Sequence, residues 1–274
     1  MSLSVDAALA GARARGLDRL DAQLLVAHVS GQGRAWLIAH GDSLLDGGAA
    51  VRLHELVGRR SAGEPLAYLL GEKEFHGLAL GVDARVLVPR PETELLVDWA
   101  LECLRRNAAA GTRVVDLGTG SGAIALAVKA ACPAADVTGT DLSRAALEVA
   151  RRNASRLGLQ VRFAHGEWWQ ALEAGARCSL AVSNPPYIAR ADRHLDALRH
   201  EPQSALTPGP SGLESLEKIV EGAPGWLDPG AWLLLEHGHD QAEAVQALLA
   251  RHQFAAIETR RDLAGLPRCT GGHR

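Results

Sequence analysis

The stretch RVVDLGTGSG, residues 113–122, decides the fold that this sequence predicts. Its first five residues form a short, mostly apolar run that is typical of a buried strand. The glycines at 118, 120 and 122 predict a tight turn, and residues 123–131 follow as a mostly apolar helix. A strand, a glycine turn and a helix in this order indicate the first unit of a parallel α/β sheet.

The same alternation continues to the end of the chain. We expect strands at 113–117, 136–140, 161–164, 178–183, 231–236 and 255–259, and helices at 123–131, 143–157, 213–223 and 240–252. Strands that alternate with helices predict a mostly parallel sheet with helices on both faces, so the expected fold class is α/β.

The part of the chain before this sheet has a different pattern. Residues 1–74 carry apolar residues at helical spacing throughout and predict an all-helical bundle, which is near neutral with 8 Lys and Arg against 9 Asp and Glu. Residues 75–90 alternate apolar and polar positions and predict a β-hairpin, and residues 92–106 predict a helix. We therefore expect a bundle at 1–74, a hairpin linker at 75–92 and an α/β domain at 93–274.

Composition excludes several classes of function. The 274 residues include 29 Lys and Arg against 32 Asp and Glu, which leaves no positive surplus for a strongly basic nucleic-acid binder. No apolar run approaches the ~20 residues that span a bilayer, and the N-terminus lacks a signal layout. The four cysteines have no metal-ligand spacing. These features predict a cytoplasmic protein with no metal site and with neither nucleic acid nor membrane as a partner.

Two neighbouring strand ends predict a nucleoside site. The turn after the first strand offers backbone N–H groups from its residues, namely Gly118, Thr119, Gly120, Ser121 and Gly122. Asp141 ends the next strand, where a carboxylate can accept both hydroxyls of a ribose. The two features together indicate an adenosine-containing ligand, and a loose dinucleotide fingerprint at Gly118, Gly120 and Ala123 leaves a dinucleotide oxidoreductase open.

A second motif lies after the fourth expected strand, in the order Asn184, Pro185, Pro186, Tyr187. Two prolines remove two N–H donors, so the carbonyl groups of this loop are free to point into a cleft. Asn184 adds a side-chain acceptor and Tyr187 adds an aromatic face. Two acceptors beside a π system suit a planar NH2 group, either an amide or an exocyclic base amine.

These motifs together resemble those of class I S-adenosylmethionine-dependent methyltransferases that act on nitrogen. The flanking runs EPLAYLLG at 64–71, VPRPETE at 88–94 and LEHG at 235–238 are similar to the HemK/PrmC family. The resemblance covers nearly the whole chain. It implies a Rossmann-like methyltransferase domain that uses S-adenosyl-L-methionine to methylate the side-chain amide (N5) of the Gly-Gly-Gln glutamine in class I peptide chain release factors.

The resemblance also implies roles for the cofactor-site residues. The loop 118–122 would wrap the methionine part of the cofactor, and Asp141 would hold the ribose. Trp168 would lie near adenine, although the adjacent Trp169 is an open alternative. Arg90 and Glu92 would organise the pocket without reacting. The family usually has Asp where this chain has Glu167, and that difference concerns only the adenine side.

On the substrate side, Asn184 would serve both cofactor and substrate. The side-chain oxygen of Asn184 and the carbonyl of Pro185 would accept the two amide N–H bonds, while Tyr187 would pack on the amide beside Pro186. His237 is expected to be structural and not a base. The bundle would recognise the release factor, and the protein would act as a monomer. The open alternatives are glutamine in a ribosomal protein, adenine N6 in DNA, and a binding module without catalysis.

Overall fold

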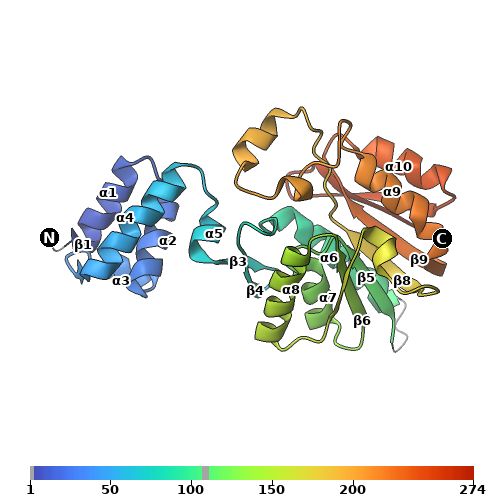
Figure 1. The fold of residues 1–274 in the computed structure, drawn as a ribbon, viewed down its shortest axis with the longest axis horizontal. Coiled ribbons are helices and arrows are strands. Elements are labelled where there is room, and N and C mark those ends of the chain that lie inside the picture. The colour runs from blue at the N-terminus through green and yellow to red at the C-terminus, as the bar shows by residue number, and fades with distance from the viewer. Residues whose placement is uncertain (1–2, 107–110) are drawn as a thin grey trace. The chain divides into compact units, whose positions relative to one another are not determined.

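The computed structural model describes residues 3–106 and 111–274, and the chain divides into two compact units, Met1–Glu72 and Lys73–Arg274 (Figure 1). Met1 and Ser2 of the predicted bundle lie outside the described residues. None of the helices that the structure describes has the length and apolar composition of a membrane span.

The first unit is built from short helices around an aliphatic core. Its helices are α1 (Val5–Ala14), α2 (Arg19–Ser30), α3 (Arg34–Ala39), α4 (Gly47–Ser61) and α5 (Leu66–Leu70). Ser4, Asp18 and Asp46 each cap a helix by accepting a backbone N–H bond, which satisfies a donor that the first turn leaves free. The helices enclose the buried side chains Leu25 and Leu53 among others.

The prediction that residues 1–74 are all-helical was wrong at two places, because a short strand pair lies inside this region and a further strand begins at Glu72. Strand β1 (Leu3–Ser4) pairs antiparallel with β2 (Leu44–Leu45). The pairing continues into the first turn of α1, where the Val5 N–H donates to the carbonyl of Ser43. A strand of two residues is too short to show a period of two, so the sequence carried no signal for it.

The second unit begins with a β-hairpin that is shorter and lies earlier than the sequence predicted. Strand β3 (Glu72–Phe75) pairs with β4 (Leu78–Gly81). His76 and Gly77 form the two-residue turn and both have positive φ, which matches the twist of a tight hairpin. Residues 82–90, which were predicted to belong to the hairpin, form no strand. They run toward η1 (Pro91–Thr93) and α6 (Glu94–Arg106).

The central sheet has seven strands in the order β10-β11-β9-β8-β5-β6-β7. These are β5 (Arg113–Leu117), β6 (Asp136–Asp141), β7 (Arg162–His165), β8 (Cys178–Ser183), β9 (Leu227–Glu236), β10 (Ala255–Arg261) and β11 (Pro267–His273). Strands β5 to β9 are mutually parallel, and β11 is antiparallel to both of its neighbours. The prediction of a mostly parallel sheet is confirmed, because its parallel core includes every predicted strand except the last.

Strand β11 was missed, so the predicted strand at 255–259 is not the final one. Its middle residues are small, and a Cβ at Gly271 would lie 2.5 Å from a methyl carbon of Leu234 and 3.0 Å from the Trp99 ring. Glycine therefore stands where large neighbours need the space, and a strand without large side chains gives no hydrophobic alternation to detect.

Helices cover both faces of this sheet (Figure 1). Alternate residues of β5 point to opposite sides. Val114 joins the core formed with α6 and α7 (Ala123–Ala131), while Val115 and Leu117 join the core formed with α9 (Glu214–Gly222) and α10 (Ala242–Arg251). Both faces are therefore buried, as parallel strands require.

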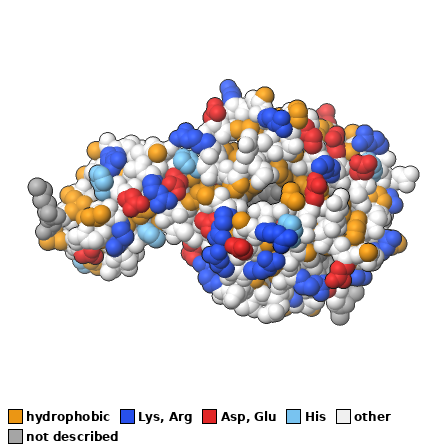
Figure 2. Space-filling model, viewed as in Figure 1, with side chains coloured by type: hydrophobic (Ala, Val, Ile, Leu, Met, Phe, Trp, Pro, Cys, Tyr) orange, Lys and Arg blue, Asp and Glu red, His pale blue; other side chains and the backbone are white. Residues whose placement is uncertain are grey.

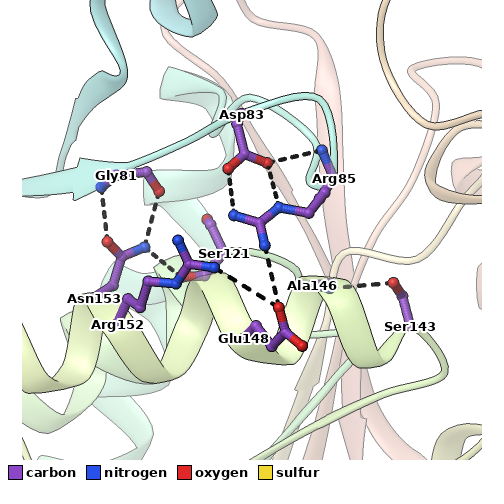
Figure 3. A network of polar contacts seen from close by, with 9 residues as sticks. All are labelled: Gly81, Asp83, Arg85, Ser121, Ser143, Ala146, Glu148, Arg152 and Asn153. Atoms are coloured by element: carbon purple, nitrogen blue, oxygen red, sulfur yellow. Dashed lines mark hydrogen bonds and ion pairs between the residues drawn. The ribbon is translucent and has the colours of Figure 1, made fainter.

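Helix α8 (Arg144–Leu157) carries a polar side chain that ties three segments together. The buried Asn153 donates from Nδ2 to the carbonyls of Ser121 (2.9 Å) and Gly81 (3.0 Å). Its Oδ1 accepts the Gly81 N–H at 2.7 Å (Figure 3). One amide thereby joins the end of β4, the turn after β5 and α8.

Asn153→Ala should lower the free energy of unfolding by about 3 kcal/mol, because three hydrogen bonds are lost and buried backbone groups are left without partners. The neighbouring Arg152 pairs with Glu148 at an exposed position. Arg152→Ala is therefore the matched control and should change stability by less than about 0.5 kcal/mol. Urea unfolding of the two variants checks this, and equal losses would contradict the assigned role of Asn153.

Candidate functional site

A cavity of about 540 Å³ opens at the carboxyl ends of the parallel strands, a size within the ~300–1,000 Å³ of small-molecule sites. It lies where the chain, after running outward through β6 and β7, returns to place β8 on the other side of β5. Ligands bind at such switch points in α/β sheets. The walls come from the turn after β5, the ends of β6 and β7, the loop after β8, and segments within 85–93 and 202–218.

The turn after β5, residues 118–122, is called the glycine loop below. The N–H groups of Gly118 and Thr119 donate to the carbonyl of Thr140, at 2.9 and 2.8 Å. A Cβ at Gly120 would meet nothing within 4 Å, so the backbone there is open to a ligand. At Gly118, φ is +76° and a Cβ would lie 3.1 Å from the Trp168 ring. Glycine is therefore required at 118 both for its conformation and for space.

Asp141 stands at the end of β6 and lines the cavity. Its Oδ2 accepts the Gly120 N–H at 2.9 Å and its Oδ1 accepts the Ser143 N–H at 2.8 Å. Burial raises the pKa of this carboxyl, and the two backbone N–H bonds oppose that rise. Each oxygen keeps acceptor capacity toward the cavity, so the carboxylate can accept bonds from ligand hydroxyls.

The two adjacent tryptophans occupy different environments. Trp168 lines the cavity and has φ of +47°, which is uncommon for a large side chain and carries a conformational cost. Trp169 is buried in the core beside α9, and its ring N–H donates to the carbonyl of Ile219 at 2.8 Å. Of the two rings, only that of Trp168 is thus available to a ligand in the cavity.

Asp116 lies beneath the glycine loop and is fully buried. Its Oδ2 accepts the Thr119 hydroxyl at 2.6 Å and the Ala125 N–H at 3.2 Å. Its Oδ1 has no hydrogen-bond partner among the residues that the structure describes. Burial raises the pKa of this carboxyl to about 7.

The loop after β8 presents an amide to the cavity. The Nδ2 of Asn184 donates to the Thr93 hydroxyl at 3.0 Å, so its Oδ1 is left for another donor. Tyr187 is turned toward the sheet, where its hydroxyl donates to Glu236 at 3.3 Å. Burial, together with the charge of Glu236, raises the pKa of Tyr187. Burial also raises the pKa of Glu236, to about 7.

Glu201 joins two walls of the cavity. Its buried carboxylate accepts the Val88 N–H at 3.0 Å and pairs with the Arg90 guanidinium. The segment that contains residues 85–93 is thereby fixed to the segment that begins at Pro202. At the rim near the Trp168 side of the cavity, Lys218 pairs with Glu167 at 2.7 Å.

His237 lies in the core and not on the cavity wall. Its Nδ1 donates to the carbonyl of Gly238 at 2.8 Å, and its Nε2 accepts from the Thr270 hydroxyl at 2.7 Å. Burial lowers the pKa of this imidazole, which suits a neutral ring that holds β9 to β11.

The cavity brings together most of the residues that the sequence singled out. On its wall lie Gly118, Thr119, Gly120, Ser121, Asp141, Trp168, Asn184 and Pro186, together with Arg90. Gly122, Pro185 and Tyr187 are not on the wall that the described residues form. Gly122 precedes α7 with φ of +84°, and Pro185 is buried.

Several residues of the site were not assigned a role from sequence. Thr93 and Glu236 lie in the runs 88–94 and 235–238, which indicate the family but no role for these two side chains. Their hydrogen-bond partners lie far away along the chain. Lys218 and Ser215 line the cavity from α9, where the sequence shows an ordinary amphipathic helix. On the face drawn in Figure 2, Lys and Arg side chains are interspersed irregularly with Asp and Glu side chains over the second unit.

Comparison with known proteins gives two family matches and close relatives. Residues 6–71 match the PrmC N-terminal domain, and residues 93–209 match the methyltransferase small domain. The chain is 52% identical to the release factor glutamine methyltransferase of Bordetella pertussis, over 94% of this chain and 96% of that protein. It is 48% identical to the protein of the same name from Burkholderia pseudomallei, over 95% and 93%.

Solved structures support the fold. A methyltransferase from Pyrococcus furiosus has a TM-score of 0.52 and 19% identity, over 72% of this chain and 88% of that one. A SAM-dependent methyltransferase from Agrobacterium tumefaciens has a TM-score of 0.52 and 16% identity, over 74% and 68%. At these identities the likeness shows the fold alone, and it confirms the predicted Rossmann-like methyltransferase architecture.

Asp116→Asn should become more stable relative to the wild type as pH rises. The folded pKa of Asp116 is raised to about 7, so its contribution to stability is fully present below the pKa of an unfolded aspartate, about 4, and is lost as pH rises from there through about 7. Asparagine does not titrate and keeps an oxygen for the Thr119 hydroxyl. Urea unfolding at pH 6 and pH 8.5 measures the difference, and a difference that stays constant with pH would refute this assignment.

Proposed function

Because this chain belongs to the release factor glutamine methyltransferase family, we propose that it transfers a methyl group from S-adenosyl-L-methionine to the side-chain N5 of the glutamine in the Gly-Gly-Gln motif of class I peptide chain release factors. The products are N5-methylglutamine and S-adenosylhomocysteine. The observation that carries the proposal is that Asn184 and the glycine loop line the same cavity, since they follow the adjacent strands β8 and β5.

The residues of the cavity fit this cofactor. The open backbone at Gly120 accommodates a chain laid against the loop, and Asp141 offers carboxylate oxygens to ribose hydroxyls. The Trp168 ring offers a flat face to adenine. Asp116 lies beneath the loop and holds it in place by accepting the Thr119 hydroxyl. The bound cofactor supplies an electrophilic methyl group.

The loop after β8 supplies what an amide substrate needs. A carboxamide nitrogen is a weak nucleophile because its lone pair is delocalised, so the enzyme gains most from positioning. In our proposal Asn184 Oδ1 and the Pro185 carbonyl accept the two N–H bonds, which aims the nitrogen at the methyl group. The same acceptors favour the positive charge that builds on nitrogen in the transition state. Tyr187, which is not on the cavity wall, supports this loop from the sheet side through its bond to Glu236. The methylated nitrogen then loses its proton to water, without a dedicated base.

The first unit is the proposed docking element for the release factor. Several large apolar side chains are exposed on it, namely Ile38 (69%), Leu44 (65%) and Val51 (70%). Exposed apolar side chains of this size are typical of protein-binding surfaces when they gather in one patch. We expect them to contribute to recognition of a part of the release factor away from its Gly-Gly-Gln tip.

The test of the function is transfer of a labelled methyl group from S-adenosylmethionine to three substrates in parallel. These are a class I release factor, the same factor with the glutamine of Gly-Gly-Gln changed to alanine, and unmethylated duplex DNA. We expect label on the intact factor alone. Label on DNA would indicate an adenine N6 enzyme, and no label on either the intact factor or DNA would exclude the release factor as substrate and favour another protein, such as a ribosomal protein.

Asn184→Ala should lower kcat by about 100-fold or more, since it removes one of two acceptors that position the amide. Cofactor Kd should change by less than about 3-fold, because the glycine loop and Asp141 remain. Calorimetric titration with S-adenosylhomocysteine and steady-state kinetics check the two quantities. Wild-type turnover in this variant would exclude the proposed amide clamp.

Asp141→Ala should have the opposite effect, which is weaker cofactor binding with little change in kcat. Loss of charge-assisted hydrogen bonds worth about 1.5–3 kcal/mol should raise the Kd for cofactor by about 10-fold or more. At saturating cofactor, kcat should stay close to that of the wild type. An unchanged Kd would show that Asp141 does not hold the ribose.

A further inference from the structure

We propose that Thr93 and Glu236 are positioning residues that determine which end of the Asn184 amide faces the substrate. This inference rests on the proposed function, since it concerns the orientation in which Asn184 accepts a substrate N–H bond. Neither Thr93 nor Glu236 touches the reacting atoms in this proposal.

The three side chains form one hydrogen-bonded chain. Asn184 follows β8 and donates from Nδ2 to the Thr93 hydroxyl at 3.0 Å. Thr93 ends η1, and hydrogen bonding from its side chain lowers the pKa of Glu236, which is the last residue of β9. Thr93 is 3% exposed and Glu236 is 1% exposed, so water does not compete for these bonds.

The direction of the hydrogen bonds between these three side chains follows from the protons that each can donate. An ionised carboxylate can only accept, so Glu236 obliges Thr93 to give it the single hydroxyl proton. The Thr93 oxygen then has only acceptor capacity left, and the group that it can bind is the NH2 of Asn184. The amide oxygen of Asn184 is thereby directed to its other side. A rotated Asn184 would place two acceptors against each other and would present NH2 to a substrate NH2.

Glu236 is built into the site in a way that packing alone does not explain. Its Oε2 has no hydrogen-bond partner in the described part of the chain, and its Oε1 also accepts the Tyr187 hydroxyl. An unpaired buried oxygen costs stability, and leucine or methionine would fill the same volume without that cost. A carboxylate at this position therefore points to a polar task, which is to orient Thr93 and Tyr187.

The charged and titratable groups around Glu236 come from several elements. Arg268 of β11 lowers its pKa and Glu92 of η1 raises it, while Tyr187 donates to it. The buried thiol of Cys269 is also close enough to be affected by this carboxyl. Desolvation outweighs these effects and raises the pKa of Glu236 to about 7.

When Glu236 is protonated, it no longer obliges the Thr93 hydroxyl to donate its proton to the carboxyl group. A neutral carboxylic acid can donate to the Thr93 oxygen, which frees the Thr93 proton to donate to Asn184 Oδ1. Asn184 can then rotate and lose its acceptor role. The folded pKa is raised, so the ionised form dominates above about pH 7, and kcat should fall as pH decreases below that value.

The kinetic experiment uses Thr93→Val, which keeps the shape of the side chain and removes the hydroxyl, with Thr93→Ser as the matched control. We expect kcat to fall about 10- to 100-fold in Thr93→Val and to recover in Thr93→Ser. Cofactor Kd should stay within about 3-fold in both, which also reports an intact fold. Wild-type kcat in Thr93→Val, or an equal loss in both variants, would overturn the proposal.

Glu236→Gln tests the role of the carboxylate. At saturating cofactor and substrate, the wild-type decrease of kcat below about pH 7 should disappear in Glu236→Gln, because the glutamine amide does not titrate. Glu102→Gln is the control, since this carboxylate pairs with Arg260 and does not line the cavity, so the acidic limb should remain in that variant. An acidic limb that persists in Glu236→Gln would overturn the assignment.

A readout without substrate separates this proposal from the proposed function. The side-chain NH2 signals of Asn184 in ¹⁵N-labelled protein, assigned by their loss in Asn184→Asp, should shift with a midpoint near pH 7 in the wild type and stay constant in Glu236→Gln. Constant signals in the wild type would refute the relay. A clear titration in a protein that methylates no release factor would refute the proposed function and leave the coupling of Glu236 to Asn184 standing.

Discussion

The parallel pairing of β5 with β8 is the constraint on which the site depends. Val114 lies opposite Leu180 and Asp116 opposite Val182, and the Ser183 hydroxyl donates to the carbonyl of Leu117 at 2.6 Å. This register brings the two strand ends level, so the glycine loop and the loop after β8 begin side by side. Helices bury both faces of the pair, and rigid strands therefore position the two sides of the cavity that the proposed function assigns to cofactor and substrate.

The site is maintained at a cost in stability. Two carboxyl groups, Asp116 and Glu236, are almost fully buried, and each has an oxygen without a partner among the described residues. Trp168 adds a left-handed backbone. A sequence selected for stability alone would avoid all three features. They occur together around one cavity.

The sequence predicted the elements and site residues that a short segment of the chain specifies. It did not predict those that depend on contacts between distant segments. The glycine loop and Asn184 follow strands in the chain, so a short window of sequence shows both the element and its end. Strand β11 escaped because its small residues fit around large neighbours from elsewhere in the fold. Trp168 and Trp169 have the same side chain, and only the contact of Trp169 with α9 distinguishes them. Contacts of this kind depend on tertiary structure and leave no periodic signal.

The chemistry of the proposed substrate site follows from the removal of donors. Two prolines supply carbonyls without N–H groups, and Thr93 binds the NH2 of Asn184, so the loop presents acceptors alone. Such a site favours a group with two N–H bonds and disfavours a carboxylate of the same shape, because acceptors would then face acceptors. It does not by itself separate a glutamine amide from the exocyclic amine of a base. In the proposed function that distinction must come from surfaces beyond the cavity, which is why recognition of the release factor is assigned to the first unit.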